Sequence, residues 1–429
     1  MGRVIRPIRR IRGEIRVPGD KSISHRALML ASIAQGESLI NGLASSRDVA
    51  STARCLRALG ASIETPADET THRVTGRGRF GLRAPTRPLD AGNSGTTMRL
   101  LSGLLAGQPF RSTITGDASL RRRPMDRIIG PLNEMGIRVD SDDGHAPLVI
   151  HGGEPHGVRY ELPVASAQVK SCLLLAGLYT DERTIIAEPE PTRDHTERML
   201  QAMGADLQRR DEAIALRGCR ELSNLDLTVP GDISSAAFLI AAALLVEDGD
   251  LILRHVGINP TRTGMLDVLQ AMGAEIERRN EREEGNEPVA DLRVTSATGL
   301  RATEIGGPSI PRLIDELPLL AVLATQAEGP TVIRDAAELR HKETDRIHAV
   351  AANLQRMGVE LEERDDGLLI DGPQRLTGAQ VNGFHDHRIV MAFAIAGLIA
   401  EGPTTIDGAD WADVSFPGFF ETLQQVAET

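Results

Sequence analysis

Six short segments of the chain are apolar at nearly every position and are bounded by polar residues. A helix that is apolar on all sides belongs in a protein core, and each of these runs is shorter than the ~20 residues that span a membrane. Small residues are frequent in them, which allows helices to pack closely. The pattern predicts six buried helices, at residues 25–34, 97–107, 170–179, 235–245, 316–325 and 388–400.

A second pattern occurs five times: an amphipathic segment with leucine, then a glycine, then alternating apolar and polar positions. Glycine readily adopts the left-handed conformation that ends a helix, and the alternation indicates a strand. The intervals between these glycines exceed the roughly 20–50 residues of solenoid repeats, so they suit larger blocks of several strands and two helices. The glycines are Gly60, Gly136, Gly204, Gly273 and Gly358.

These blocks predict an α/β (α+β) fold with two similar domains, each containing three of the buried helices. A length of 429 residues is compatible with two large domains. The alternation from Ile8 to Val17 predicts an additional strand near the N-terminus.

Each predicted buried helix begins with polar residues, as in Lys21-Ser22, Ser166-Ala167-Gln168 and Asp386-His387-Arg388. Ser, Thr, Asp and Asn are ordinary N-caps, but Arg and Lys are unfavourable at the positive end of a helix unless an anion lies there. If the helix starts converge, their free N–H groups and dipoles form an anion site.

Composition narrows the possible partners of this site. The net charge of -12 argues against a protein that binds nucleic acid or a membrane surface, because either needs a basic face. Cys55, Cys172 and Cys219 are widely spaced and form no CxxC motif, so neither a disulfide framework nor a zinc site is indicated. We therefore expect the protein to be located in a reducing cytosol. The Arg-rich N-terminus lacks the apolar core of a signal peptide, so we expect no targeting role.

Lysine is scarce in this chain. Lys and Arg number 48 together, but the only lysines are Lys21, Lys170 and Lys342. Because the chain uses Arg for ordinary positive charge, a remaining lysine is expected where a compact ammonium is needed and a planar guanidinium does not fit. Lys21 and Lys342 lie in polar motifs, which favours function; for Lys170, function and chance are equally balanced.

Three common site types fit the sequence poorly. VPGDKS is not a P-loop, because Asp20 stands between Gly19 and Lys21 and no second glycine has the required spacing. His385 and His387 flank Asp386 without a metal-binding spacing, so we expect no metal. No GxSxG elbow is present, which disfavours covalent catalysis.

Mixed-charge motifs remain as candidates for proton transfer. RHKETDRI predicts a helix with Lys342 and Arg346 on one face, and Glu343 beside them as an acid or base. Asp315 stands at the mouth of a buried helix, where it could act as a base. Each motif alone is also typical of a solvated, salt-bridged surface; together they indicate a basic pocket with a few carboxylates.

Eight motifs in this order resemble the family of 5-enolpyruvylshikimate-3-phosphate synthases, which act in the shikimate pathway to chorismate and the aromatic amino acids. They are VPGDKSISHRAL, AGNSGTTMRL, RRRPMD, ASAQVKS, TRDHTE, IDELPLLA, RHKETDRI and FHDHRI. The resemblance implies a two-domain inside-out α/β barrel, with three βαβαββ units per domain. It also implies transfer of the enolpyruvyl group of phosphoenolpyruvate to the 5-hydroxyl of shikimate 3-phosphate, without cofactor or metal, by a monomeric cytoplasmic enzyme.

The same resemblance implies roles for individual residues. Asp315 would deprotonate the 5-hydroxyl, Glu343 would move protons at the methylene carbon, and Lys21 would contact both substrates. Shikimate 3-phosphate would be bound by Lys21, Ser22, Arg26, Ser166, Gln168, Arg193, Asp315 and Lys342. Phosphoenolpyruvate would be bound by Lys21, Gly95, Arg123, Gln168, Arg346 and Arg388.

The resemblance also implies that the chain crosses between the domains at residues 17–20 and 229–232, where VPGD occurs twice. One domain would comprise residues 21–231 and the other 1–20 plus 232–429, and closure of the cleft would bring Lys21 toward Asp315. Many members of the family carry a lysine where this chain has Val414, so that contact is absent or replaced.

Two other functions stay open at this point. A UDP-N-acetylglucosamine enolpyruvyl transferase would share the fold and the donor, but its members resemble Lys-Asn at Lys21-Ser22 and usually carry a cysteine in the loop that here reads GDASLRRRPMD. A non-catalytic anion-binding relative would have lost Asp315, Glu343 or Lys21, and all three are present.

Overall fold

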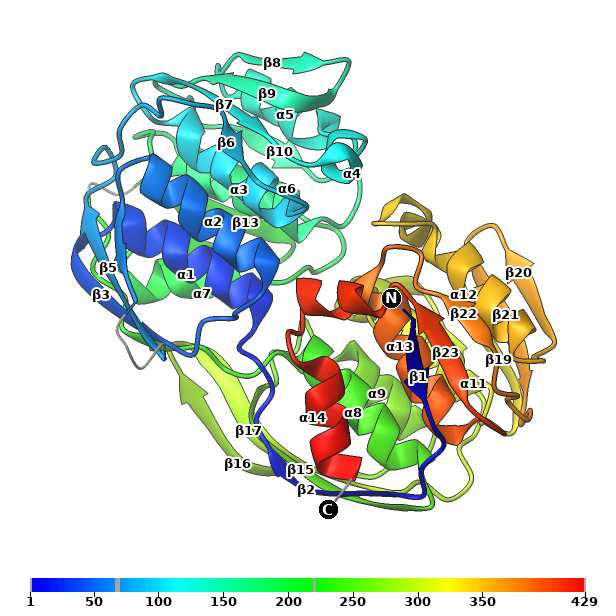
Figure 1. The fold of residues 1–429 in the computed structure, drawn as a ribbon. Coiled ribbons are helices and arrows are strands. Elements are labelled where there is room, and N and C mark those ends of the chain that lie inside the picture. Colours follow the sequence, from blue (N-terminus) through cyan, green and yellow to red (C-terminus); the bar gives the residue numbers. More distant parts are fainter. Residues whose placement is uncertain (1, 66–69, 219–220, 428–429) are drawn as a thin grey trace. The chain divides into compact units, whose positions relative to one another are not determined.

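The computed structural model describes residues 2–65, 70–218 and 221–427. Its contacts divide into two compact units (Figure 1). The second unit comprises Gly19–Pro230 and Glu283–Glu287; the first comprises the residues before Gly19, Gly231–Arg282, and the chain from Pro288 onward. Each unit has its own apolar core. That the units act as separate domains stays a prediction.

Three four-stranded sheets and seven α-helices make up the described part of the second unit. The sheets have the orders β14-β3-β5-β4, β6-β7-β9-β8 and β10-β11-β13-β12. The elements are α1 (Lys21–Ile33), β3 (Gln35–Asn41), α2 (Arg47–Ala58), β4 (Ser62–Glu64), β5 (Thr71–Arg77), β6 (Leu89–Asp90), α3 (Gly95–Ala106), β7 (Arg111–Thr115), α4 (Ala118–Arg121), α5 (Asp126–Glu134), β8 (Val139–Asp142), β9 (His145–His151), β10 (Arg159–Glu161), α6 (Ala167–Gly177), β11 (Arg183–Ala187), α7 (His195–Ala202), β12 (Asp206–Arg210), β13 (Ala213–Arg217) and β14 (Leu227–Thr228).

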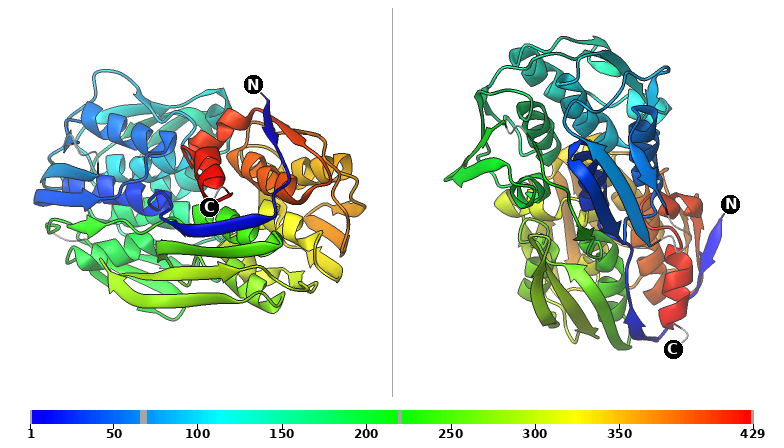
Figure 2. Two further views of the ribbon diagram at one scale, coloured as in Figure 1. Left: turned by 60° about the horizontal axis from the view of Figure 1, so that its bottom comes forward. Right: turned by 90° about the vertical axis from the view of Figure 1, so that its left-hand side faces the viewer.

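The described part of the first unit repeats this plan with sheets of the orders β2-β15-β17-β16, β18-β19-β21-β20 and β1-β23-β22. The strands of the first of these sheets lie side by side in Figure 2. The elements are β1 (Arg3–Ile5), β2 (Arg10–Ile15), α8 (Ile233–Leu245), β15 (Asp248–Gly257), α9 (Gly264–Ala271), β16 (Ile276–Glu284), β17 (Glu287–Thr295), β18 (Glu304–Ile305), the 3₁₀ turn η1 (Gly307–Ser309), α10 (Ile310–Leu313), α11 (Leu317–Ala324), β19 (Gly329–Ile333), η2 (Ala337–His341), α12 (Arg346–Arg356), β20 (Leu361–Arg364), β21 (Gly367–Gly372), β22 (Gln380–Asn382), α13 (His387–Ile399), β23 (Thr404–Asp407), η3 (Ala409–Val414) and α14 (Phe419–Ala427).

The predicted α/β fold and its repeats are confirmed. The six apolar segments form the buried helices α1, α3, α6, α8, α11 and α13. Each of the five repeated glycines follows an amphipathic helix with a positive φ between 83° and 90°, and a strand comes next. In this conformation a side chain would be strained, so glycine ends the helix and turns the chain into the strand.

In four sheets a buried helix connects two parallel neighbouring strands, as α3 connects β6 to β7. The two remaining sheets exchange their first strands. β2 precedes α1 in the chain but pairs with β15 of the first unit, and β14 precedes α8 but pairs with β3 of the second unit. The chain therefore passes from one unit to the other between strand and helix.

The two VPGD segments occupy these passages and have equivalent geometry. The amide of Asp20 donates to the carbonyl of Pro230 at 2.7 Å, and the amide of Asp232 donates to the carbonyl of Pro18 at 2.9 Å. Asp20 then caps α1 by accepting from the amide of Ile23, as Asp232 caps α8. The repeated motif thus pairs with itself and begins two helices.

The hairpin of β16 and β17 makes a further connection that the sequence did not indicate. Its tip, Glu283–Glu287, belongs to the second unit, while both strands otherwise belong to the first. Glu287 lies 2.7 Å from Nδ1 of the buried His195, and the carbonyl of Asn286 accepts from Arg198 at 2.7 Å. The tip is therefore bonded to α7 of the second unit.

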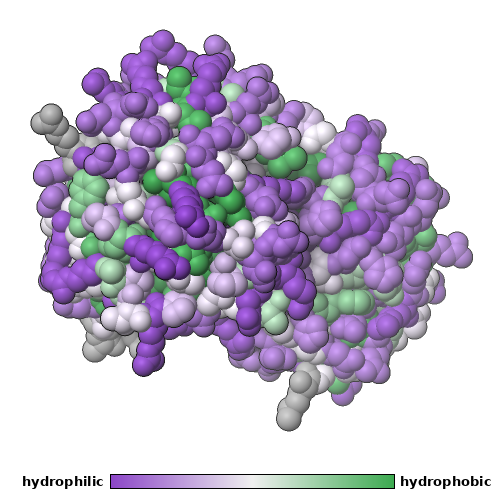
Figure 3. Space-filling model, turned by 90° about the horizontal axis from the view of Figure 1, so that it is seen from above, coloured by the Kyte–Doolittle hydropathy of each residue, from purple (hydrophilic) through white to green (hydrophobic). Residues whose placement is uncertain are grey.

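Apolar residues are concentrated inside the units. Val4, Phe80 and Val164 are the only exposed large hydrophobic residues in the part of the chain that the structure describes. Hydrophilic side chains predominate on the face in Figure 3, and hydrophobic ones form small groups. Among the described residues there is no helix with the length and apolar character of a membrane span.

Gly103 tests the close packing of the buried helices. A Cβ atom at this position of α3 would lie 2.1 Å from the carbonyl oxygen of Cys172 on α6. We expect Gly103→Ala to lower the free energy of unfolding by about 1–3 kcal/mol because backbone must shift. The exposed Gly130 of α5 has no neighbour within 4 Å of such an atom, so Gly130→Ala should stabilise by up to about 1 kcal/mol. Equal effects in urea unfolding would contradict the packing argument.

Candidate active site

The second unit holds one cluster of polar side chains at the starts of its buried helices. Lys21 is the first residue of α1, and its Nζ lies 3.0 Å from Oδ2 of Asp48, in the first turn of α2. Both side chains are partly exposed, at 20% and 12%. The carboxylate offsets an ammonium that the helix dipole disfavours, and it holds the ammonium at a solvent-accessible position.

Arg26 lies one turn further along α1 and is almost fully buried. Its Nε donates to Oγ1 of Thr196 at 2.7 Å, and its Nη2 donates to Oγ of Ser171 at 2.8 Å. Arg193 extends to the same region, where its Nη1 lies 3.4 Å from Oγ of Ser22. Three helices, α1, α6 and α7, thereby meet around two arginines.

The starts of α3 and α6 are also connected. Ser166 caps α6. The side-chain Nε2 of Gln168 donates to Oγ1 of Thr96 at 3.0 Å. The amide oxygen of Gln168 accepts from Nη1 of Arg99 at 2.5 Å. Gln168 is therefore oriented on both sides by residues of α3.

The start of α3 carries the other two predicted residues of this unit. Gly95 is the first residue of α3, and a Cβ atom there would lie 3.4 Å from Nη1 of Arg123 and 3.2 Å from Nη1 of Arg99. Nη2 of Arg123 donates to Oδ1 of Asn93 at 2.8 Å. A residue without a side chain lets these guanidinium groups approach the helix start.

The first unit holds a second cluster, centred on Arg346. This arginine is the first residue of α12, its side chain is 2% exposed, and three carboxylates surround it. Nε lies 2.8 Å from Asp386, Nη2 2.8 Å from Glu343, and Nη1 3.4 Å from Asp315. Burial lowers the pKa of Arg346, but the three carboxylates outweigh burial and raise it. The guanidinium is permanently charged and fixed in direction.

Arg388 continues this cluster on α13. Its Nη1 lies 3.5 Å from Oε1 of the buried Glu316 and its Nη2 3.9 Å from Oδ2 of Asp315. Burial raises the pKa of Glu316, and the charge of Arg388 opposes that shift. The Nε of Arg388 is buried without a hydrogen-bond partner in the described residues. A buried donor of this kind is suited to an anion.

Further contacts join the helix starts of the first unit. Ser234 at the start of α8 donates to the carboxylate of Glu316, the N-cap of α11. Nη2 of Arg262 donates to Ser234 at 2.8 Å and to Asp232 at 3.1 Å. The starts of α8, α11 and α13 thus share one network.

One sequence prediction about this cluster is wrong. Lys342 and Arg346 do not lie on one face of a helix. Lys342 has extended backbone after the 3₁₀ turn η2, and Asp345 caps α12 by accepting from the amide of His348, so this helix begins only at Arg346. The aspartate side chain competes successfully with the helix for the free amide. Glu343 still meets Arg346, but from outside the helix.

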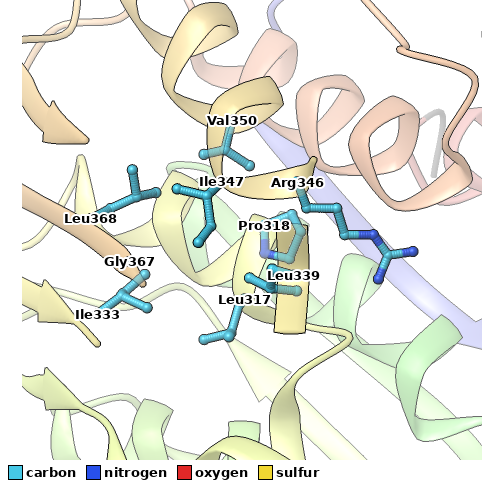
Figure 4. Close-up of a pocket in the computed structure, with 9 residues that line it drawn as sticks. All are labelled: Leu317, Pro318, Ile333, Leu339, Arg346, Ile347, Val350, Gly367 and Leu368. Carbon is cyan, nitrogen blue, oxygen red and sulfur yellow. The ribbon is translucent and has the colours of Figure 1, made fainter. Parts of the chain in front are cut away.

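A small apolar pocket borders Arg346 and is unsuited to binding a charged substrate. Aliphatic side chains such as Leu317, Ile347 and Leu368 line it. Figure 4 shows the stem of Arg346 at its edge and the guanidinium pointing away from it. The pocket offers no cation to a phosphorylated ligand, so the charged clusters are the better candidates for the site.

The described residues 2–65, 70–218 and 221–427 contain no group of three or more His, Cys, Asp or Glu side chains placed to hold a metal ion. Val414, where many relatives were expected to carry lysine, is buried at the end of η3.

Comparisons with known proteins identify the family. The family model described as EPSP synthase (3-phosphoshikimate 1-carboxyvinyltransferase) matches residues 5–423. The relative named 3-phosphoshikimate 1-carboxyvinyltransferase from Desulforudis audaxviator is 54% identical over 424 residues, covering 98% of both chains. The relative of that name from Brevibacillus brevis is 50% identical over 426 residues, covering 99% of both. The chain belongs to the EPSP synthase family.

Solved structures agree with this assignment. EPSP synthase from Acinetobacter baumannii superposes with a TM-score of 0.89 at 43% identity, covering 99% of this chain and 98% of that one. The enolpyruvyl transferase NikO from Streptomyces tendae has a TM-score of 0.80 at 20% identity, covering 99% and 96%, and shows the fold alone.

The structure also adds to the candidate site three residues that the sequence analysis did not select. Asp48 pairs with Lys21, Arg99 orients Gln168, and Asp386 holds Arg346. The sequence indicated Asp386 at the start of a buried helix, but it did not indicate that Asp386 pairs with Arg346. Asp48 and Arg99 lie on other helices than the residues that they contact, so no spacing in the sequence links them.

The cysteines allow a test of whether a thiol of this chain could act as a nucleophile. Cys55 and Cys172 are free and buried, and burial raises the pKa of both thiols to about 12. Both groups are therefore protonated at pH 8 and unreactive. Cys219 lies outside the described residues, so the test uses Cys219→Ser. We expect no reaction of the native variant with a disulfide reagent at pH 8 and reaction of both thiols after denaturation; fast labelling of the native variant would contradict this.

Proposed function

We propose that this protein transfers the enolpyruvyl group of phosphoenolpyruvate to the 5-hydroxyl of shikimate 3-phosphate and releases phosphate. Membership of the EPSP synthase family supports the reaction. The observation that carries it in the structure is the position of the cations. Lys21, Arg346 and Arg388 lie at or next to the first residue of their helices, where the dipole favours an anion.

The two substrates together carry two phosphates and two carboxylates, which require several cations and hydrogen-bond donors. In the second unit, Arg193 and Ser22 lie within 3.4 Å of one another, and we assign them to the phosphate of shikimate 3-phosphate. The other shikimate 3-phosphate ligands in this unit are Lys21, Arg26, Ser166 and Gln168.

We assign phosphoenolpyruvate to Arg346 and Arg388 of the first unit and to Lys21, Gly95, Arg123 and Gln168 of the second. Arg346 already contacts three carboxylates, so an anionic substrate must compete with them for the guanidinium. This requirement favours a substrate with high charge density, such as a phosphate beside a carboxylate.

Asp315 and Glu343 are the proposed proton-transfer groups, together with Lys21. Asp315 would take the proton from the 5-hydroxyl as the hydroxyl oxygen bonds to C2 of phosphoenolpyruvate, while Glu343 would give a proton to the C3 methylene, which becomes a methyl group. In the second step the C2–O bond to phosphate breaks, and Glu343 would remove a proton from the methyl group, which restores the double bond. Lys21 would neutralise the departing phosphate.

This mechanism uses no metal, cofactor or covalent bond to the protein. Lys342 would bind shikimate 3-phosphate beside Asp315. We further propose that the protein acts as a cytoplasmic monomer on these small molecules alone. The acidic net charge of -12 supports the absence of nucleic acid and of membrane lipid among its partners.

Phosphate release distinguishes the proposed acceptor from its rival. We expect the protein to release phosphate from phosphoenolpyruvate in the presence of shikimate 3-phosphate and not in the presence of UDP-N-acetylglucosamine. The Asp315→Asn variant is the control, because loss of the base should lower kcat by about 10²–10⁴-fold. Release only with the nucleotide sugar would overturn the proposal.

Lys342 tests the argument from scarce lysine. We expect Lys342→Arg to raise KM for shikimate 3-phosphate about 10-fold, because a guanidinium retains the charge but not the compact shape of an ammonium. Arg356 is exposed at the end of α12, so Arg356→Lys is a matched exchange in the opposite direction that should leave KM unchanged. Steady-state kinetics decide, and unchanged kinetics for Lys342→Arg would refute the argument.

A further inference from the structure

Lys170 is the lysine that neither the sequence nor the proposed reaction explains. It lies in the first half of α6, and its side chain is fully buried. Its Nζ lies 2.9 Å from Oε2 of Glu188, 2.7 Å from Oε1 of Glu197, and 3.3 Å from the carbonyl of Thr192. A buried ammonium needs such partners, because an unpaired charge inside a protein is very unfavourable.

The partners of Lys170 belong to one continuous segment. Glu188 follows the last residue of β11, Thr192 lies in the loop after it, and Glu197 is in the first turn of α7. Glu188 in addition accepts from the hydroxyl of Thr192 at 2.8 Å and pairs with Arg209 at 3.1 Å. Lys170 therefore fastens both ends of residues 188–197 to α6, and the four charges balance.

This segment carries Arg193, which we assign to the phosphate of shikimate 3-phosphate, and Thr196, which contacts Arg26. Arg193 follows Thr192 directly and reaches Ser22 at 3.4 Å. Thr196 precedes Glu197, accepts from Arg26 at 2.7 Å, and bonds to Ser171, the residue after Lys170. Two of the three residues that Lys170 holds are therefore next in sequence to such a group. Thr192 precedes Arg193 itself, and Glu197 follows Thr196, which contacts Arg26.

We propose that Lys170 is a positioning residue that sets the placement of Arg193 and Arg26, and so the affinity for shikimate 3-phosphate, without touching the substrate. The proposal rests on the proposed function. The compact ammonium donates to Glu188 and to the carbonyl of Thr192 and lies within ion-pair distance of Glu197, whereas a planar guanidinium is larger and does not fit the same space in a filled core. This accounts for a lysine at this position of an arginine-rich chain.

The difficulty in testing this role is that removal of a buried cation also destabilises the fold. Burial raises the pKa of Glu197, and the charge of Lys170 opposes the shift. In Lys170→Met the carboxylate of Glu197 would remain buried without its cation, whereas Glu188 would keep Arg209. Lys170→Met/Glu197→Gln removes that second charge as well, so it should recover most of the lost thermal stability while the ionic fastening stays absent.

We expect this double variant to show a KM for shikimate 3-phosphate raised at least about 10-fold, and a Kd by calorimetry raised equally, because small displacements of binding groups are costly. KM for phosphoenolpyruvate and kcat should change less than about threefold. Arg209→Gln is the matched control: it contacts the same Glu188 from the exposed side and should leave both KM values unchanged.

Recovery of wild-type KM and Kd for shikimate 3-phosphate together with stability would overturn the proposal, since Lys170 would then be structural only. An equal rise of both KM values would overturn it too. If the double variant does not fold, Glu197→Gln alone tests the proposal, because it removes one of the two carboxylates that face Lys170. We expect KM for shikimate 3-phosphate to rise about threefold, while Tm falls less than in Lys170→Met because Glu188 still pairs with Lys170. An unchanged KM would overturn the proposal. Turnover by the wild-type protein tests the proposed function separately, because it involves no change at Lys170.

Discussion

The structure depends on placing cations at the positive ends of buried helices. The dipole of a helix disfavours Lys or Arg in its first turn, yet Lys21, Arg346 and Arg388 all lie there. The protein offsets each of them with a nearby carboxylate. Those carboxylates must be buried or half-buried in turn, and so the helix starts carry most of the ionic interactions that matter for the site.

This arrangement requires the helices to approach one another closely. Small residues permit that approach, as Gly103 of α3 does against the backbone of α6. Close approach brings the helix starts within reach of single side chains, so that Gln168 contacts α3 and Arg26 contacts both α6 and α7. The apolar core and the charged site are therefore consequences of the same packing, and a change in one is expected to affect the other.

Sequence patterns predicted the helices and strands that carry the site residues well, but they predicted few of the contacts between those residues. Helices apolar on every side are recognisable because burial imposes their composition, and the left-handed glycines are recognisable because few other residues adopt that conformation. The error at Lys342 arose where the Asp345 cap interrupted a helical pattern. Asp345 is a residue type that commonly caps a helix, but a prediction from helical spacing alone takes no account of caps.

The sequence by itself determined the α/β class, the repeated units, the buried helices and, through its motifs, the family. Those properties depend on periodicity and on residue types at one place in the chain. Only the tertiary structure decided that Asp48 faces Lys21, that Asp386 holds Arg346, and that Lys170 is buried between two glutamates. Such partners come from helices and loops far apart in the chain, and their pairing follows from how helices pack, which no local pattern encodes.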